Sequence, residues 1–411
     1  MSRCSVGAGG KLWRHYLVKT TLHRPLRVAL LVSVLMISMS AWADEQVTTS
    51  KKPSHSGFSF PLGDNWRVTP YIAPGYTPEM GALLAAGGLL SFKTSMADTV
   101  IQRSSLPIVA SYSTNKSILL GVILTSYWKE DALRIQADLT LKDMPDHYFG
   151  VGYDAGRHTP QSESTTGYHR TWVWFNPRIL FRVKTDLYCG LDWDVNYTRA
   201  TDPGTVMLAD PYFQEFGAEN FNHGLGFIVQ FDSRDIPVNA WGGTYFSGRV
   251  RFYDATFGSD NDYQIFDLDF RRYFPLGRPG RTLVWQFRSR TGRGDVPWAE
   301  LSQPGSPFDL RGYRWGQYRD KAMVYSILEF RNMIADRDRE PDGISPHGVV
   351  AWIAAGSLAE RANEYKNWLP NFGVGYRFEV QPRMNVRLDI GFADDVSGWS
   401  PAFYFNFNEA F

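Results

Sequence analysis

Residues 187–196 read LYCGLDWDVN, a pattern that recurs along most of the chain. Apolar side chains occupy the odd-numbered positions, while Asp192 and Asp194 occupy even-numbered ones. Successive side chains of a β-strand point to opposite faces of the sheet, so a period of two separates these residues onto two faces. The stretch therefore predicts a strand with one apolar face and one strongly polar face.

The same alternation appears in six further segments and indicates an all-β protein. These segments are residues 133–140, 225–232, 266–271, 283–288, 372–378 and 386–391. A soluble β-sandwich also alternates, but its inner face carries compact aliphatic residues and its strands usually run about 5–6 residues. Here the runs are rich in Phe, Tyr and Trp, and many approach the roughly 9–11 residues that cross a bilayer. We therefore expect a transmembrane antiparallel β-barrel with a charged, water-filled lumen.

The links between strands support a barrel. Short links at 184–186, 275–280 and 381–383 alternate with long polar links at about 142–166, 201–221, 294–320 and 357–370. Outer-membrane barrels have short periplasmic turns and longer outer loops, which gives this rhythm. At roughly 22 residues for each strand and its connection, residues 66–411 predict about 16 strands, an even number as bacterial barrels require.

The first residues have the layout of a secretory signal peptide. Basic residues from Arg14 to Arg27 precede an apolar stretch at 28–41, and Ala41-Trp42-Ala43 resembles a cleavage site. The apolar stretch is about 14 residues long, short of the roughly 20 that a membrane-spanning helix needs. We expect residues 1–43 to be a signal peptide, the polar residues 44–65 to be a periplasmic linker, and residues 66–411 to form the barrel.

Charge and motifs exclude several classes of function. Residues 1–43 contain six of the 43 basic residues and none of the 42 acidic ones, so the expected mature chain has 37 basic residues and a net charge of −5. Nucleic-acid binding requires a basic face, so no nucleic-acid partner is expected. Phosphate-binding loops, zinc-binding helices and nucleophile elbows are absent from the sequence. We therefore expect no enzyme activity, no catalytic residues, no cofactor and no metal site.

Four segments of the C-terminal half resemble the BamA/TamA-type outer-membrane barrels, the bacterial surface antigen family. They are 230–243 (QFDSRDIPVNAWGG), 267–276 (DLDFRRYFPL), 310–316 (LRGYRWG) and the closing strand pair at 386–411. The resemblance implies a 16-stranded barrel with an extracellular loop that folds inward. It fits members that lack the periplasmic POTRA repeats, because residues 44–65 are too few to hold one.

The resemblance also implies a loop-anchor motif, formed by Arg311, Gly312 and Tyr313. In the family the loop arginine pairs inside the lumen with acids on neighbouring strands, and Glu329 matches one of them by position. An arginine–carboxylate fork suits such a site, and a glycine allows the tight backbone. Without the family context, a solvent-exposed arginine of little energetic value is the simpler interpretation.

A second acid of the family pattern is missing. The strand around Trp352 has Ala354 where the family often has an aspartate two residues after the aromatic. We therefore expect Asp267 or Asp269 as further lumen partners of Arg311.

The sequence ends in an alternating aromatic segment, FYFNFNEAF at 403–411. An exposed strand edge of this kind would promote aggregation in a soluble protein, whereas a barrel closes its last strand against its first. Phe407 and Phe411 are therefore expected to act as the barrel-closing signal.

Three classes of function remain open. The resemblance favours a factor that assists protein or lipid insertion or translocation at the outer membrane, with weak pairing between the first and last strands. The alternatives are a passive pore or structural surface antigen, and an outer-membrane enzyme. Expected partners are outer-membrane lipid or lipopolysaccharide, unfolded outer-membrane proteins or lipids, and a second copy in a homodimer.

Overall fold

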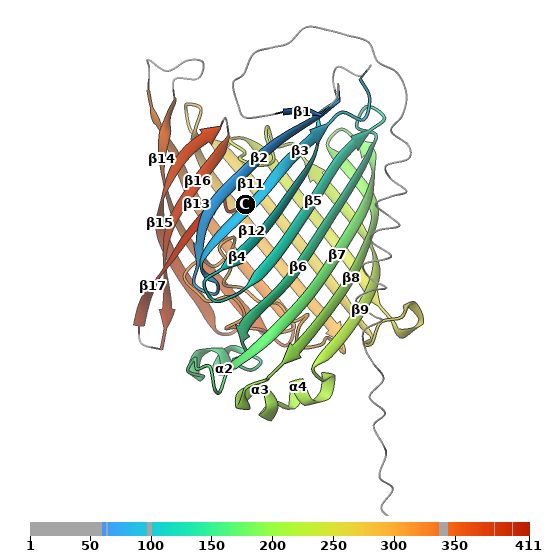
Figure 1. The fold of residues 1–411 in the computed structure, drawn as a ribbon, viewed down its shortest axis with the longest axis vertical. Helices are drawn as coiled ribbons and strands as arrows, with labels where there is room; N and C mark the ends of the chain where they lie inside the picture. Colours follow the sequence, from blue (N-terminus) through green and yellow to red (C-terminus); the bar gives the residue numbers. More distant parts are fainter. Residues whose placement is uncertain (1–59, 63–64, 97–100, 337–343, 382, 397) are drawn as a thin grey trace, which may run out of the picture. The chain divides into compact units, whose positions relative to one another are not determined.

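The computed structural model describes residues 60–411 except 63–64, 97–100, 337–343, 382 and 397. The expected signal peptide and most of the expected linker lie outside the described residues. Sixteen strands, β2 to β17, form a closed antiparallel barrel in which each strand pairs with its neighbour in sequence and β17 returns to β2 (Figure 1). This confirms the expected fold class.

The barrel strands are 10 to 18 residues long, enough to cross a bilayer, which takes about 9–11 tilted residues. In chain order they are β2 (Trp66–Thr77), β3 (Gly81–Phe92), β4 (Ser104–Ser113), β5 (Ile118–Trp128), β6 (Leu133–His147), β7 (Gly167–Lys184), β8 (Leu187–Thr201), β9 (Glu219–Asp232), β10 (Gly243–Tyr253), β11 (Tyr263–Pro275), β12 (Arg281–Gly294), β13 (Ala322–Ala335), β14 (Ile344–Ala359), β15 (Trp368–Gln381), β16 (Met384–Asp395) and β17 (Gly398–Phe407).

The two ends of the barrel differ. Helices α2 (Tyr153–His158), α3 (Thr205–Ala209) and α4 (Pro211–Phe216) gather at one end, here named the loop end (Figure 1). The other end, named the turn end, carries short links such as that between β7 and β8. No helix among the described residues is long and apolar enough to span a membrane.

A short strand precedes the barrel at the turn end. β1 (Phe60–Leu62) pairs antiparallel with the start of β2, with Phe60 opposite Val68. Part of the expected linker, residues 60–62, is therefore a strand. The pairing gives the backbone of β1 hydrogen-bond partners that an irregular segment would have to find in water.

The side chains point to the inner and outer faces of the barrel as the alternation in the sequence predicts. On β8, Leu191 is 56% exposed on the outer face, whereas Asp192 and Asp194 are each 1% exposed on the inner face. The same division holds on β16, where Leu388 is 47% exposed and Asp389 is 1% exposed. The barrel therefore presents an apolar belt outward and encloses a densely charged lumen, the pattern of membrane barrels.

Candidate functional site

The boundary between β17 and β2, here named the seam, is the weakest junction in the barrel. β16 pairs with β17 along the whole of β17, and β2 pairs with β3 along the whole of β2. β17 and β2 share a single paired position, Phe405 opposite Tyr76. Very few backbone hydrogen bonds therefore close the barrel at the seam.

The sequence of β2 explains part of this weakness. Pro70 and Pro74 lack an N–H group, and because they are four residues apart their nitrogens face the same edge of the strand. The ladder with β3 is unbroken, so the donors are missing from the edge that faces β17. Gly75 lets β17 come close to β2 beside the paired position, because a Cβ at residue 75 would lie 3.2 Å from the carbonyl oxygen of Phe405.

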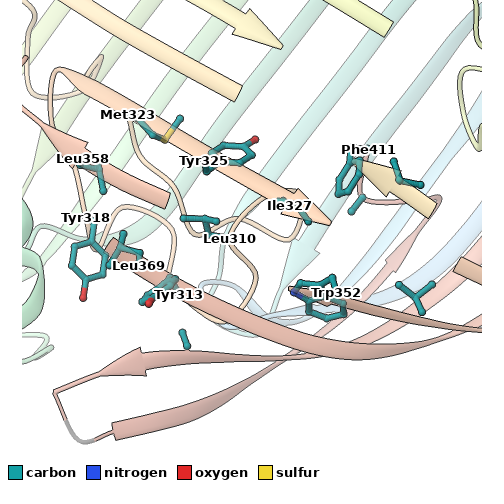
Figure 2. Close-up of a cluster of buried hydrophobic side chains, with 14 of the residues drawn as sticks. Leu310, Tyr313, Tyr318, Met323, Tyr325, Ile327, Trp352, Leu358, Leu369 and Phe411 are labelled. Carbon is teal, nitrogen blue, oxygen red and sulfur yellow. The ribbon is translucent and has the colours of Figure 1, made fainter. Parts of the chain in front are cut away.

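The link between β12 and β13, residues 295–321, folds into the lumen beside the seam. Leu310 is fully buried and Tyr313 is 2% exposed. Both belong to a cluster of buried side chains that includes Tyr325 and Ile327 of β13, Trp352 and Leu358 of β14, and Leu369 of β15 (Figure 2). Apolar packing therefore holds the loop against the inner wall of β13 to β15.

Arg311 lies at the centre of this docked loop and is fully buried. Its Nη1 donates a hydrogen bond to Asp389 Oδ2 at 2.9 Å, and its Nη2 donates to Glu329. The guanidinium also lies 3.6 Å from the ring centroid of Trp352. Gly373 leaves room for that indole, because a Cβ there would come within 2.1 Å of the ring. Charge, hydrogen bonds and cation–π contact therefore fix the loop at one residue.

A larger network of charges surrounds this pair. Arg331 Nε donates to Glu329 Oε1 at 2.7 Å, and Arg377 bridges Asp389 at 2.6 Å and Glu409 at 2.9 Å. Sequence reasoning missed Asp389 and Glu409 as members. The signal for Asp389 was present, because it is the acid on the lumen face of the alternating stretch 386–391. Glu409 lies beyond β17, where no strand pattern places it.

The expected pairing of Asp267 and Asp269 with Arg311 is wrong. Both acids face the lumen, but Asp267 lies 3.4 Å from Arg288 and Asp269 lies 2.6 Å from Arg271. Asp269 stands directly opposite Arg288 in the β11–β12 ladder. Arginines on the same and adjacent strands take these acids, while the loop arginine reaches acids on β13 and β16.

The two residues of the expected barrel-closing signal, Phe407 and Phe411, lie in different surroundings, and their closing role stays a prediction. Phe407 pairs with Val386 and ends β17. Asn408 has a φ of 61°, and the following residues turn into the lumen. Phe411 is 8% exposed, and its carbonyl oxygen accepts a hydrogen bond from Arg331 at 3.0 Å. The arginines of the lumen therefore hold this tail in place of a continued strand.

The docked loop contacts both sides of the seam. The Gly312 N–H donates to the hydroxyl of Tyr404 on β17 at 2.9 Å. Three residues on, the Trp315 N–H donates to Glu79, in the link between β2 and β3, at 3.1 Å. Gly312 has a φ of 119°, and a Cβ there would lie 3.0 Å from Ala393 of β16. A side chain at position 312 would therefore push the loop off the wall.

Aromatic residues cover the loop at the loop end. Trp298 is fully buried among Tyr148, Tyr168 of β7 and Phe213 of α4, and its Nε1 donates to the carbonyl of Gly217 at 2.9 Å. In the part of the chain that the structure describes, no three His, Cys, Asp or Glu side chains group closely enough to hold a metal ion. The site is thus built from packing, hydrogen bonds and buried ion pairs.

These features define a class of protein: a closed sixteen-stranded membrane-type barrel with an inward loop and a short seam. Residues 104–411 match the model of the Omp85 superfamily domain, and the chain belongs to this superfamily. Omp85 barrels are outer-membrane proteins. The resemblance to BamA/TamA-type barrels noted in the sequence is thereby confirmed.

Two solved structures with a similar fold share little sequence with this chain. BamA from Haemophilus ducreyi lacking POTRA domains 1–3 is 13% identical with a TM-score of 0.57, over 92% of this chain and 78% of that one. CdiB from Acinetobacter baumannii is 11% identical with a TM-score of 0.50, over 84% of this chain and 60% of that one. This chain thus spans less than two thirds of CdiB. No curated protein matches.

Proposed function

We propose that this protein assists the insertion or translocation of proteins or lipids at the outer membrane by opening its seam. The observation that carries the proposal is the single paired position between β17 and β2. A residue pair exchanges at most two backbone hydrogen bonds, each worth about 0.5–1.5 kcal/mol net. Separating the two strands therefore costs far less than separating any fully paired neighbours.

An open seam would present two strand edges to the membrane. Unpaired backbone groups cost several kcal/mol each in hydrocarbon, so these edges would favour an added strand. A client β-strand could pair there in the way that extended peptides add to a sheet edge. This supports unfolded outer-membrane proteins as partners, with lipid or lipopolysaccharide as the surrounding solvent.

The loop 295–321 would control this opening. It joins β17 through Gly312 and the β2–β3 link through Trp315, and it is held in the lumen by Arg311. Both sides of the seam would separate only when one of these contacts is released. The proposed activity needs no catalytic residue, so we propose a non-enzymatic protein.

A passive pore has less support. The loop 295–321 and residues 408–411 both occupy the lumen, with Leu310 fully buried and Phe411 8% exposed. A solute would meet packed side chains and buried ion pairs along this path. These contacts therefore favour a function at the barrel wall over the passage of a solute along the barrel axis.

A disulfide across the seam tests the proposal. Tyr76 and Phe405 are opposite each other on the outer face, so their Cα atoms fall in the range of about 4.5–5.5 Å that a disulfide can bridge. We would refold residues 44–411 carrying Cys189→Ser, Tyr76→Cys and Phe405→Cys into liposomes. The readout is the folding rate of a small unfolded barrel protein added from outside.

We expect the reduced variant to accelerate folding of the client and the oxidised variant to lose this effect. The matched control is Val374→Cys with Ile390→Cys, an outward pair on β15 and β16, whose oxidation should change nothing. Folding no faster than in empty liposomes would refute the insertase, and equal rates in both redox states would refute opening at the seam.

A further inference from the structure

A second polar chamber lies in the lumen, apart from the Arg311 network. It is a cavity of about 290 Å³ between the loop 295–321 and the inner face of β7 to β13. A water molecule needs only about 10–15 Å³ of such volume, so a polyatomic ion fits. Five arginines line it: Arg170, Arg249, Arg251, Arg288 and Arg290.

One of these arginines, Arg251, forms ion pairs with two aspartates, and a glycine on the strand between them makes this possible. Arg251 Nε donates to Asp192 Oδ2 at 2.8 Å and its Nη1 lies 3.6 Å from Asp194. Arg251 and Asp192 stand on β10 and β8, and both are opposite Gly226 of the strand between them. The ion pair therefore crosses β9 where no side chain intervenes.

Three others have unused donors. Arg249 makes no hydrogen bond or ion pair with any described residue, and its Nε is buried without an acceptor. Arg170 is 2% exposed, and its Nε and Nη1 have no hydrogen-bond acceptor, since the nearest carboxylate oxygen, on Asp146, lies 3.7 Å from Nη1. Arg288 Nε is also buried without an acceptor.

Four acids line the chamber against its five arginines, and one of them, Asp267, already lies 3.4 Å from Arg288 and 3.8 Å from Arg290. Asp194 accepts from Trp174 at 2.8 Å and from Tyr253 at 3.0 Å. Asp309 Oδ1 accepts three backbone N–H groups of its own loop. Burial, with Asp194 nearby, raises the pKa of Glu300 to about 7, so its negative charge is incomplete at neutral pH. The chamber thus has an excess of positive charge and unfilled donors.

We propose that this chamber binds a phosphate or phosphate ester through Arg170, Arg249 and Arg288. The guanidinium fork matches phosphate and carboxylate oxygens better than any other side chain does. The three arginines come from three different strands, β7, β10 and β12. A tetrahedral oxyanion offers acceptors in several directions, whereas a planar carboxylate offers them in one plane. The inference does not depend on the seam.

Thermal unfolding of the refolded protein in detergent tests the proposal. We would compare inorganic phosphate with sodium chloride at the same ionic strength, for wild type, Arg249→Gln, Arg288→Gln and Arg293→Gln. Arg293 is an exposed arginine on β12 that lies over the ring of Phe266, outside the chamber, and serves as the matched control. A ligand that binds only the folded state stabilises it by RT ln(1 + [L]/Kd), so the melting temperature rises with ligand concentration.

We expect phosphate to raise the melting temperature of wild type and Arg293→Gln by several degrees, and to leave Arg249→Gln and Arg288→Gln unchanged. In chloride, Arg249→Gln should melt no lower than wild type, because it removes a buried cation that has no partner. A melting transition of Arg249→Gln at this temperature also shows that the variant folds.

The proposal is overturned if phosphate has no effect beyond that of chloride, or if it stabilises Arg249→Gln and Arg288→Gln as much as wild type. Acetate acting as strongly as phosphate would also overturn the choice of a tetrahedral oxyanion. Glycerol phosphate distinguishes the source of the phosphate: a larger shift than with inorganic phosphate supports a lipid headgroup, and an equal or smaller shift supports a free ion.

Discussion

Two junctions in the same barrel are held by different forces. β6 and β7 pair without a register shift from Leu133 opposite Phe181 to His147 opposite Gly167. β17 and β2 meet at one position, although the loop inside them carries buried ion pairs and hydrogen bonds to both sides. The first junction depends on backbone hydrogen bonds, and the second depends on side chains that a single loop brings together.

This difference has a mechanical consequence. A ladder of backbone bonds opens only when many bonds break together, whereas a junction held by a few side-chain contacts opens when one of them is lost. The wall at β6 to β8 should therefore stay closed under conditions that separate β17 from β2. Substitutions of Arg311 and Gly312 test this difference at decreasing strength, and Glu300 tests the burial of the same loop.

Arg311→Ala should have the largest effect. It leaves Glu329 and Asp389 short of a partner in a site with no solvent exposure, and breaking a buried pair costs about 3–5 kcal/mol. We expect a loss of this size in the free energy of unfolding, measured by urea unfolding from liposomes. Arg361→Ala is the control, because Arg361 is 72% exposed and 3.9 Å from Glu364, a pair worth at most about 1 kcal/mol. Equal losses in the two variants would refute the role of Arg311.

Gly312→Ala should have an intermediate effect and can be compared with Gly258→Ala. Both glycines have positive φ, 119° and 92°, but only Gly312 has neighbours near an added Cβ. Left-handed backbone costs a non-glycine residue about 1–2 kcal/mol, so Gly258→Ala should lose about that much. Gly312→Ala should lose more, because Ala393 lies 3.0 Å away. Urea midpoints of the two variants measure the difference, and a smaller loss at Gly312 would contradict the docked loop.

The smallest effect concerns pH. Burial and the nearby Asp194 raise the pKa of Glu300 from 4.5 to about 7. Between these values the folded state holds more protons than the unfolded state, so the free energy of unfolding falls as pH rises from about 4.5 to about 7. Glu300→Gln should flatten this slope, whereas Glu360→Gln, at an exposed position of the loop end, should keep it. An unchanged slope in Glu300→Gln would show that the carboxyl is not buried as described.

The sequence predicts the barrel and its lumen face because both depend on a local period of two. Asp192 and Asp389 are placed inside by alternation with apolar neighbours alone, whereas Glu329 was placed there by its position in the family motif. Strand number follows from length and the rhythm of the links. The inward loop came from the family motif around Arg311, since no local pattern distinguishes a docked loop from a solvated one.

The partners of each lumen charge could not be read from the sequence. Alternation places Asp267, Asp269 and Asp389 on the same face, but which of them Arg311 reaches depends on the path of the loop across the barrel. Residues 408–411 were read as strand because the aromatic alternation continues through Phe407. Their turn inward follows from the pairing of Glu409 with Arg377, a contact between distant strands that no local pattern contains.

Amide hydrogen exchange in lipid nanodiscs tests most directly whether side chains, in place of backbone bonds, close the seam. We predict that amides on the seam-facing edge of β2 exchange much faster than those of β6 and β7, and that Arg311→Ala accelerates β2 and β17 further while leaving β6 and β7 unchanged. Equal protection of β2 and β7 in the wild type would contradict the short seam. An equal acceleration of all strands in Arg311→Ala would contradict its control by the loop.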